Sequence, residues 1–178
     1  MLKRILLRLA CVLLMSAVPA VAQLGVYGKL DLNRYTDTNA NSTNWLYGAG
    51  IGVYDNFIHA GPIALGGDLR GEFASGNNHS YRSLLVGPRI ALKLPIINFS
   101  PYLEPLFGYG GGKYSGQTAA DVTTSYDNKF LYGGVGGLDI TVLPHLDWRV
   151  IEAGYITEHN GNLPNPSILL STGIVIRL

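Results

Sequence analysis

Charged side chains recur inside the apolar segments of this sequence, where they alternate with hydrophobic residues and therefore share one face of each segment. Charges of both signs in a confined space could form salt bridges, select ions or relay protons, because an unpaired buried charge is costly. We expect a salt-bridged network that fills an interior, and an ion-selective pore or a proton relay is the alternative. The network consists of Lys29, Arg70, Arg89, Lys93, Arg149, Arg177, Asp31, Asp68, Glu72, Glu104, Asp139 and Glu152.

The histidines and glycine runs give no pattern that is typical of catalysis. His59, His79 and His145 are scattered among predicted loops and turns, without the spacing of metal ligands. The glycine runs at 48–52 and 110–112 match no complete phosphate-binding fingerprint, and neither opens a predicted helix. We therefore predict no catalytic residue, no cofactor-binding residue and no metal site, and we expect no cofactor.

Period-two alternation is the organising pattern of the chain, and it recurs in about eight segments. Segments of roughly ten residues with this alternation are the signature of a transmembrane barrel. The predicted fold class is all-β, an eight-stranded antiparallel up-and-down transmembrane β-barrel. An apolar strand that ends the chain at 168–178 fits this fold, because a closed barrel pairs it with the first strand. The residues expected to face lipid include Leu30, Ile51, Leu69, Ile90, Leu138 and Ile174.

One pair of charges departs from the alternation. Arg149 and Glu152 are separated by an odd number of residues, so a regular strand would turn one of them toward lipid. A β-bulge at Val150 or Ile151 would return both side chains to the interior. The alternative is that Arg149 lies at the membrane interface.

The N-terminal residues have the pattern of an export signal. Three basic residues precede an apolar run at 9–18, and small residues at 20–22 form a cleavage site. We predict a signal peptide over 1–22 and one barrel domain over 23–178. The only cysteine, Cys11, would leave with the signal. Three of the 13 basic residues would leave as well, so 10 basic groups face 12 acidic groups, which gives no general electrostatic reason to bind nucleic acid.

Polar connectors and tight turns alternate between the predicted strands. The connectors cover 35–44, 74–80, 111–128 and 158–166, and the turns lie near 55–62, 95–100 and 143–147. Short turns on one side and longer loops on the other fit a barrel with periplasmic turns and extracellular loops. Aromatic residues near both ends predict two interfacial girdles, with Trp45, Phe73, Tyr81, Tyr109, Phe130 and Tyr155 beside the loops and Tyr54, Phe99, Tyr102 and Trp148 near the turns. Tyr27 and Tyr102 are also expected to help fill the interior.

Four segments carry a resemblance to a known family: Val86-Gly87-Pro88-Arg89, the stretch at 132–139, Trp148–Tyr155 and Thr172–Leu178. The mature chain resembles the small porin-like, opacity-type outer-membrane β-barrel family, in the form of an OmpA-like barrel without a periplasmic domain. In the last segment, Gly173, Ile176 and Leu178 match the family's C-terminal assembly signal, although members usually end in an aromatic residue. The resemblance implies the outer membrane of a Gram-negative-type cell, contact with its lipid, and recognition by the barrel-assembly machinery.

These observations favour a non-enzymatic, monomeric outer-membrane protein with a structural, membrane-integrity or adhesion-like role through extracellular loops. Its surface ligand is unknown. A narrow porin-like channel and a soluble lipocalin-like binder are alternatives, because alternation alone does not say which face lies inside. A lipid A-modifying enzyme is a further alternative. His159 and the Asn165-Pro166 pair are similar to a motif of outer-membrane lipid A deacylases, but Gly161 replaces the serine nucleophile of that motif.

Overall fold

A computed structural model describes residues 23–37, 42–76, 79–93, 98–114, 126–159 and 165–178. These residues form a closed barrel of eight strands, in which each strand is antiparallel to the next. The strands are β1 (Gln23–Asp37), β2 (Ser42–Ala60), β3 (Ile63–Gly76), β4 (His79–Leu92), β5 (Phe99–Tyr114), β6 (Lys129–Leu143), β7 (Leu146–Glu158) and β8 (Asn165–Arg177). The predicted fold class is confirmed. Within the described residues, no helix is long and apolar enough to cross a membrane.

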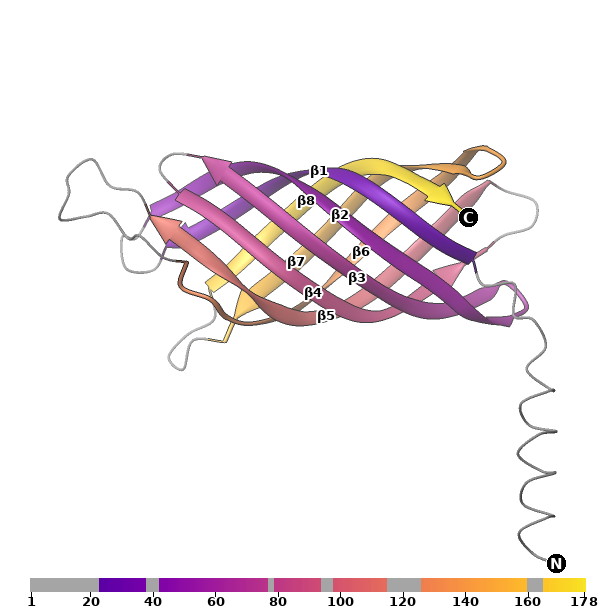
Figure 1. The fold of residues 1–178 in the computed structure, drawn as a ribbon, viewed down its shortest axis with the longest axis horizontal. Coiled ribbons are helices and arrows are strands. Elements are labelled where there is room, and N and C mark those ends of the chain that lie inside the picture. Colours follow the sequence, from indigo (N-terminus) through magenta and orange to yellow (C-terminus); the bar gives the residue numbers. More distant parts are fainter. Residues whose placement is uncertain (1–22, 38–41, 77–78, 94–97, 115–125, 160–164) are drawn as a thin grey trace, which may run out of the picture.

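The first and last strands close the barrel. β1 pairs with β8 from Gly25 opposite Arg177 to Arg34 opposite Ile168. Figure 1 shows tilted strands, with the start of β1 and the end of β8 at the same end of the barrel. We call this the terminal end, and it also holds the turns at 61–62 and 144–145. The opposite end, where β3 and β5 finish and β4 and β6 begin, is called the loop end.

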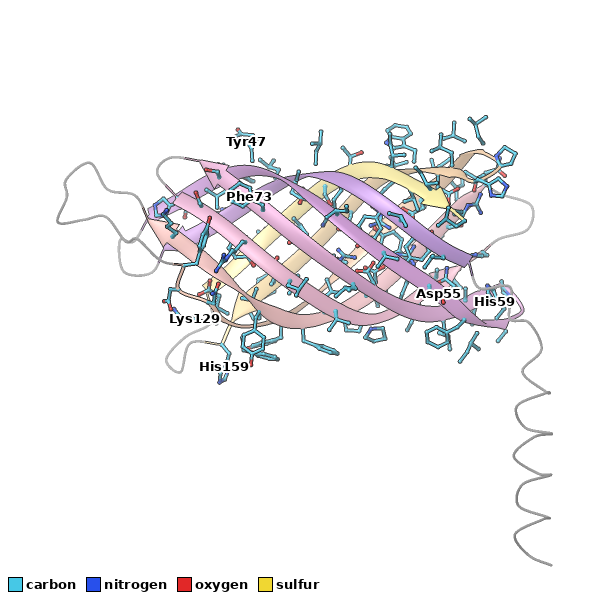
Figure 2. All side chains as sticks on the ribbon, viewed as in Figure 1. Tyr47, Asp55, His59, Phe73, Lys129 and His159 are labelled. Atoms are coloured by element: carbon cyan, nitrogen blue, oxygen red, sulfur yellow. The ribbon has the colours of Figure 1, made fainter. Side chains whose placement is uncertain are left out.

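Burial alternates along the strands as the sequence predicts, with apolar residues outside and charged residues inside. Leu30 and Ile51 are each 68% exposed, and Leu69, Ile90 and Ile174 are also exposed. Leu138 is only half-buried. The outward side chains form a continuous apolar belt around the barrel, and Figure 2 shows Tyr47 and Phe73 projecting from it. An apolar outer wall with charges inside contradicts the soluble-binder alternative, in which the apolar face would line the interior.

The predicted aromatic girdles are only partly correct. Most of the residues named for them are exposed on the outer wall, but Tyr54, Tyr81 and Tyr102 are buried in the interior. These three tyrosines stand at inward positions of the alternation, and that parity decides their direction more strongly than their closeness to a strand end. Tyr47 is exposed and joins the outer aromatic residues of the loop end, a placement that the sequence analysis missed.

Inward-facing glycines make room for the interior tyrosines. A β-carbon added at Gly52 would overlap the ring of Tyr27, and one added at Gly137 would overlap the ring of Tyr102. Small barrels have interiors just wide enough for side chains, so each of these rings lies over a glycine directly opposite it on the neighbouring strand. Glycines within the strands of this chain therefore have a packing role, although glycine weakens an ordinary strand.

Candidate functional site in the barrel interior

Ten of the twelve predicted network residues lie together in the barrel interior. All ten side chains are buried: Lys29, Asp31, Asp68, Arg70, Glu72, Arg89, Glu104, Asp139, Arg149 and Glu152. The other two lie toward the terminal end. The Arg177 guanidinium is 3.0 Å from the Asp147 carboxylate, a partner that the sequence analysis missed. Lys93 follows β4, and burial, with repulsion from Arg177 and Arg89, lowers its pKa to about 8.

Glu152 is the hub of the network, because its carboxylate accepts hydrogen bonds from four other strands. Lys29 Nζ of β1 and Arg70 Nη1 of β3 each donate to Oε1 at 2.9 Å. Tyr102 of β5 donates its hydroxyl to Oε2 at 2.6 Å, and Ser171 of β8 donates to Oε1 at 3.1 Å. This single side chain therefore connects β7 with β1, β3, β5 and β8 across the lumen.

A chain of ion pairs extends from this hub along the interior. Arg70 pairs with Asp68 at 2.8 Å and also with Glu104, which pairs in turn with Arg89. Arg89 reaches Asp139 at 3.0 Å. Arg149 Nε also contacts Asp139 at 3.0 Å, which closes the chain back to β7. Cations and carboxylates thus alternate through the network, as a buried ionic cluster requires when each charge needs a partner.

Aromatic rings cover the guanidinium groups of this cluster. The Arg89 guanidinium carbon lies 3.9 Å from the centre of the Tyr102 ring and 4.2 Å from that of Tyr54. The Arg149 guanidinium lies 4.2 Å from the centre of the Tyr27 ring, and cation–π attraction at such distances is strongest where water is excluded. Tyr27 and Tyr102 fill the interior as predicted, whereas Tyr54 is an additional member.

A β-bulge in β7 places both Arg149 and Glu152 inside. Arg149 pairs with Gly173 of β8 and Glu152 with Ser171, so two residues, Val150 and Ile151, lie opposite one. Both charged side chains are buried completely. Of the two alternatives that the sequence left open, the structure therefore has the bulge, and the interfacial position considered for Arg149 is wrong.

The buried cluster carries more carboxylates than cations. Its ten residues comprise six carboxylates and the four cations Lys29, Arg70, Arg89 and Arg149. Asp31 is the least supported carboxylate, because Lys29 Nζ lies 3.4 Å from Oδ1 and neither carboxylate oxygen has a hydrogen-bond partner among the described residues.

A second, apolar layer fills the interior toward the loop end, and the sequence analysis missed it. Its fully buried members include Leu46, Leu85, Leu106, Leu131 and Leu169, joined by Val135 and Ile156. The signal for this layer was present in the sequence, because several of these residues stand inside runs of three apolar residues such as 84–86 and 168–170. A strand with both faces apolar packs against hydrocarbon on one side and against other side chains on the other.

Polar groups gather at the described part of the loop end. The Arg82 guanidinium carbon lies 4.1 Å from the centre of the Tyr126 ring, and Lys113 Nζ lies 6.0 Å from the same centre. Lys129 pairs with Asp127 at 2.9 Å. Most of the longest predicted connector, residues 115–125, lies outside the described residues.

The histidines are not brought together. Figure 2 shows His59 near the terminal end and His159 at the loop end, pointing away from the barrel. The ring centre of His159 lies 6.4 Å from that of Tyr132 on the outer wall. Among the described residues, no group of three or more histidine, cysteine, aspartate or glutamate side chains could hold a metal ion.

The predicted assembly signal lies at the seam between β8 and β1. Ile176 and Leu178 are exposed on the outer wall. Gly173 faces inward, where an added β-carbon would overlap the β1 backbone at Gly28 and Lys29. The glycine therefore allows β8 to lie close against β1, which is a structural reason for this residue in addition to the predicted signal.

No family model and no curated protein sequence matches this chain. Solved structures share its fold. Neisserial surface protein A has a TM-score of 0.59 and 13% identity, over 87% of this chain and 97% of that protein. Ail, the attachment invasion locus protein of Yersinia pestis, has a TM-score of 0.60 and 14% identity, over 88% and 99%. A structure of Ail in complex with the heparin analogue sucrose octasulfate has a TM-score of 0.56 and 13% identity, over 88% of this chain and 99% of that chain.

Proposed function

We propose that this chain is a non-enzymatic, monomeric outer-membrane β-barrel that makes surface contacts through its loop end. The observation that carries the proposal is an outward apolar belt around an interior filled with side chains. An apolar wall of this kind is stable in hydrocarbon, where backbone polar groups must pair within the barrel and charged groups must stay away from lipid. The low-identity neighbours, an Ail protein and a neisserial surface protein, support the location by their fold.

The filled interior favours a scaffold over a channel. The charge cluster around Glu152 and the apolar layer around Leu85, Leu106 and Leu131 lie one after the other along the barrel. An apolar constriction resists the entry of water and ions, and a network of ion pairs across the lumen holds its side chains in place. The narrow-channel alternative has no observation in its favour among the described residues.

The loop end is therefore the part of the barrel best suited to bind a partner. Loops on a rigid scaffold commonly carry binding residues because they can vary without loss of the fold. The Lys129 ammonium is paired with Asp127 and Glu158, but Arg82 and Lys113 give the described part of this end two cationic groups near Tyr126. These groups fit a partner with phosphate or sulfate groups, by charge and by hydrogen-bond geometry. The complex of Ail with a heparin analogue is a precedent within the same fold.

The proposal is tested in cells that display the protein. Fractionation and protease shaving of intact cells locate the chain, and binding of fluorescent sulfated dextran or of lipopolysaccharide measures the surface contact. We expect deletion of residues 119–125 to leave heat-modifiable migration intact and to weaken binding. Arg82→Ala with Lys113→Ala should weaken it at least fivefold.

A matched control changes the opposite end of the barrel. Substitution of Pro144 in the short turn at the terminal end should leave surface binding unchanged. Recovery in the soluble fraction would overturn the location. Surface binding that is equal for wild type, the loop deletion and the double variant would overturn the role of the loop end.

A further inference from the structure

The outer wall has an apolar groove at the seam where β1 meets β8. The groove has a volume of about 690 Å³, which is within the range of about 300–1,000 Å³ that is typical of small-molecule sites. Its outward-facing lining includes Val26, Gly28, Leu30, Ile51, Trp148 and Ile174. It lies on the outer wall, and its lining also includes Tyr27 and Lys29, which are buried in the interior.

The strand register explains the groove. Gly28 lies directly opposite Ile51 of β2 on one side and Ile174 of β8 on the other. Trp148 of β7 lies opposite Ile174, so one row across four strands has large apolar side chains with a gap at Gly28. A β-carbon added at Gly28 would meet no atom within 4 Å. Ala49 lies opposite Leu30, and its short side chain extends the gap into the neighbouring row.

One wall of the groove is held in position by the bulge of β7. Trp148 donates its indole N–H to Thr172 Oγ1 at 3.2 Å. Thr172 in turn donates to the backbone carbonyl of Arg149 at 2.9 Å, just before the irregularity in pairing at 150–151. Trp148 is therefore fixed at the edge of the groove, so the groove has a defined shape.

We propose that this groove binds one acyl chain of a membrane phospholipid. This inference rests on the proposed membrane location, because the groove is continuous with the apolar belt that would face hydrocarbon. Within a bilayer, association depends on van der Waals contact, and an unfilled gap between Ile51 and Ile174 loses that contact. A slim, flexible hydrocarbon chain can enter such a gap.

A second copy of the barrel fits the groove less well. A two-fold contact places the same patch of both copies face to face. With the two-fold axis at Gly28, two concave surfaces would then face each other and enclose a void. Gly28 lies five residues from the start of β1, which is about 12 Å along the axis of a tilted barrel. The bound acyl chain therefore belongs to a lipid of the leaflet nearer the terminal end.

The test uses the full-length mature protein in phosphatidylcholine vesicles that contain a fraction of lipid with a diazirine on one acyl chain. After illumination, mass spectrometry maps the lipid adducts. We expect adducts on groove residues such as Leu30 and Ile174, which are 68% and 56% exposed, to exceed by at least threefold those on Leu84 of β4 and Phe107 of β5, which are 60% and 45% exposed. Gly28→Leu should fill the gap and remove this excess.

Two further variants keep the test decisive. Gly71→Leu is the matched control, because Gly71 is an outward glycine of β3 with only one atom, 3.9 Å away, near an added β-carbon. Gly71→Leu should leave the excess of lipid adducts on the groove residues unchanged. Ala49→Leu fills the same groove from β2 and should also remove the excess if Gly28→Leu fails to give heat-modifiable protein.

Each result has a separate meaning. Equal adducts around the whole belt, or an excess that persists in both groove-filling variants, would overturn the acyl-chain site while leaving the membrane location intact. A dimer in detergent that dissociates on Gly28→Leu would replace the lipid with a second copy. Failure of the wild-type protein to float with vesicles would overturn the membrane location itself.

Discussion

Replacement of Glu152 by glutamine is the most informative change in the interior, because the side chain keeps its shape and loses its charge. The new amide group would face donors whichever way it turns. On one side it would meet Lys29 Nζ and Arg70 Nη1, both at 2.9 Å from Oε1, and on the other the Tyr102 hydroxyl and Arg149 Nη1, at 2.6 and 3.3 Å from Oε2. The tyrosine hydroxyl can rotate, so the amide should settle on that side.

The size of the expected loss in unfolding free energy depends on which carboxylates each cation still contacts after the substitution. Lys29 retains Glu72 at 2.7 Å, Arg70 retains Asp68 at 2.8 Å, and Arg149 retains Asp139 at 3.0 Å. Each of these cations therefore keeps a carboxylate partner, but each loses its charge-assisted hydrogen bond to Glu152. Loss of hydrogen bonds to a charged partner costs about 1.5–3 kcal/mol. We expect Glu152→Gln to lower the free energy of unfolding by about that amount.

Asp31→Asn is the matched control, because it removes the same charge from the same cluster. The Asp31 carboxylate has only Lys29 nearby, at 3.4 Å, and the cluster has two carboxylates more than it has cations. We expect a change within about 1 kcal/mol of wild type, or a gain in stability, because the lost negative charge is the least supported one.

The assay is urea unfolding of the protein in phospholipid vesicles at neutral pH, followed by tryptophan fluorescence and by heat-modifiable migration. The free energy is obtained by linear extrapolation for wild type and both variants. A loss below about 1 kcal/mol for Glu152→Gln, or a larger loss for Asp31→Asn, would show that Glu152 is not the hub of the network.

The other predictions concern the pore, the apolar layer, the turn and the terminal end. Planar-bilayer recordings of the wild-type protein should show no steady, ion-selective conductance, and single-channel steps whose selectivity changes on Arg89→Glu would contradict the closed interior. Leu131→Ala, at a fully buried position of the apolar layer, should lower stability by about 2–5 kcal/mol in the same unfolding assay, and an unchanged unfolding midpoint would argue against tight packing there. His145→Gly should raise the free energy of unfolding by up to about 1 kcal/mol, because His145 has a φ of 92° that glycine adopts without strain. The substitution also removes the contact of the His145 ring with the Arg177 carbonyl at 3.2 Å. A clear loss of stability would mean that this contact outweighs the relief of backbone strain. Amine labelling of Lys93, read by mass spectrometry across a pH series, should reach half its maximal rate near pH 8, because burial and two nearby arginines lower its pKa from the usual value of about 10.4; a midpoint above pH 10 would place this amine in water.

The sequence by itself determined the architecture and the sidedness of the strands. Period-two alternation fixes which side chains share a face, and a charge such as Arg70 or Glu104 cannot be solvated by hydrocarbon, so these residues must point inward. Local parity also narrowed the position of Arg149 to two alternatives, because Arg149 and Glu152 could both be inside only if the strand gained a residue between them. The structure chose the bulge over the interfacial position. These are properties of one strand at a time, and one strand can be interpreted without its neighbours.

Only the tertiary structure decided which interior residues meet. Lys29 and Glu152 are 123 positions apart, and their contact depends on the stagger of eight strands around the barrel. The same stagger separates Lys93 and Arg177 from the other ten charges and stacks the leucine layer on the loop side of the cluster. It also opens the groove at Gly28. Alternation specifies the direction of a side chain, but the height at which it meets a partner across the lumen depends on how all the strands are shifted against one another.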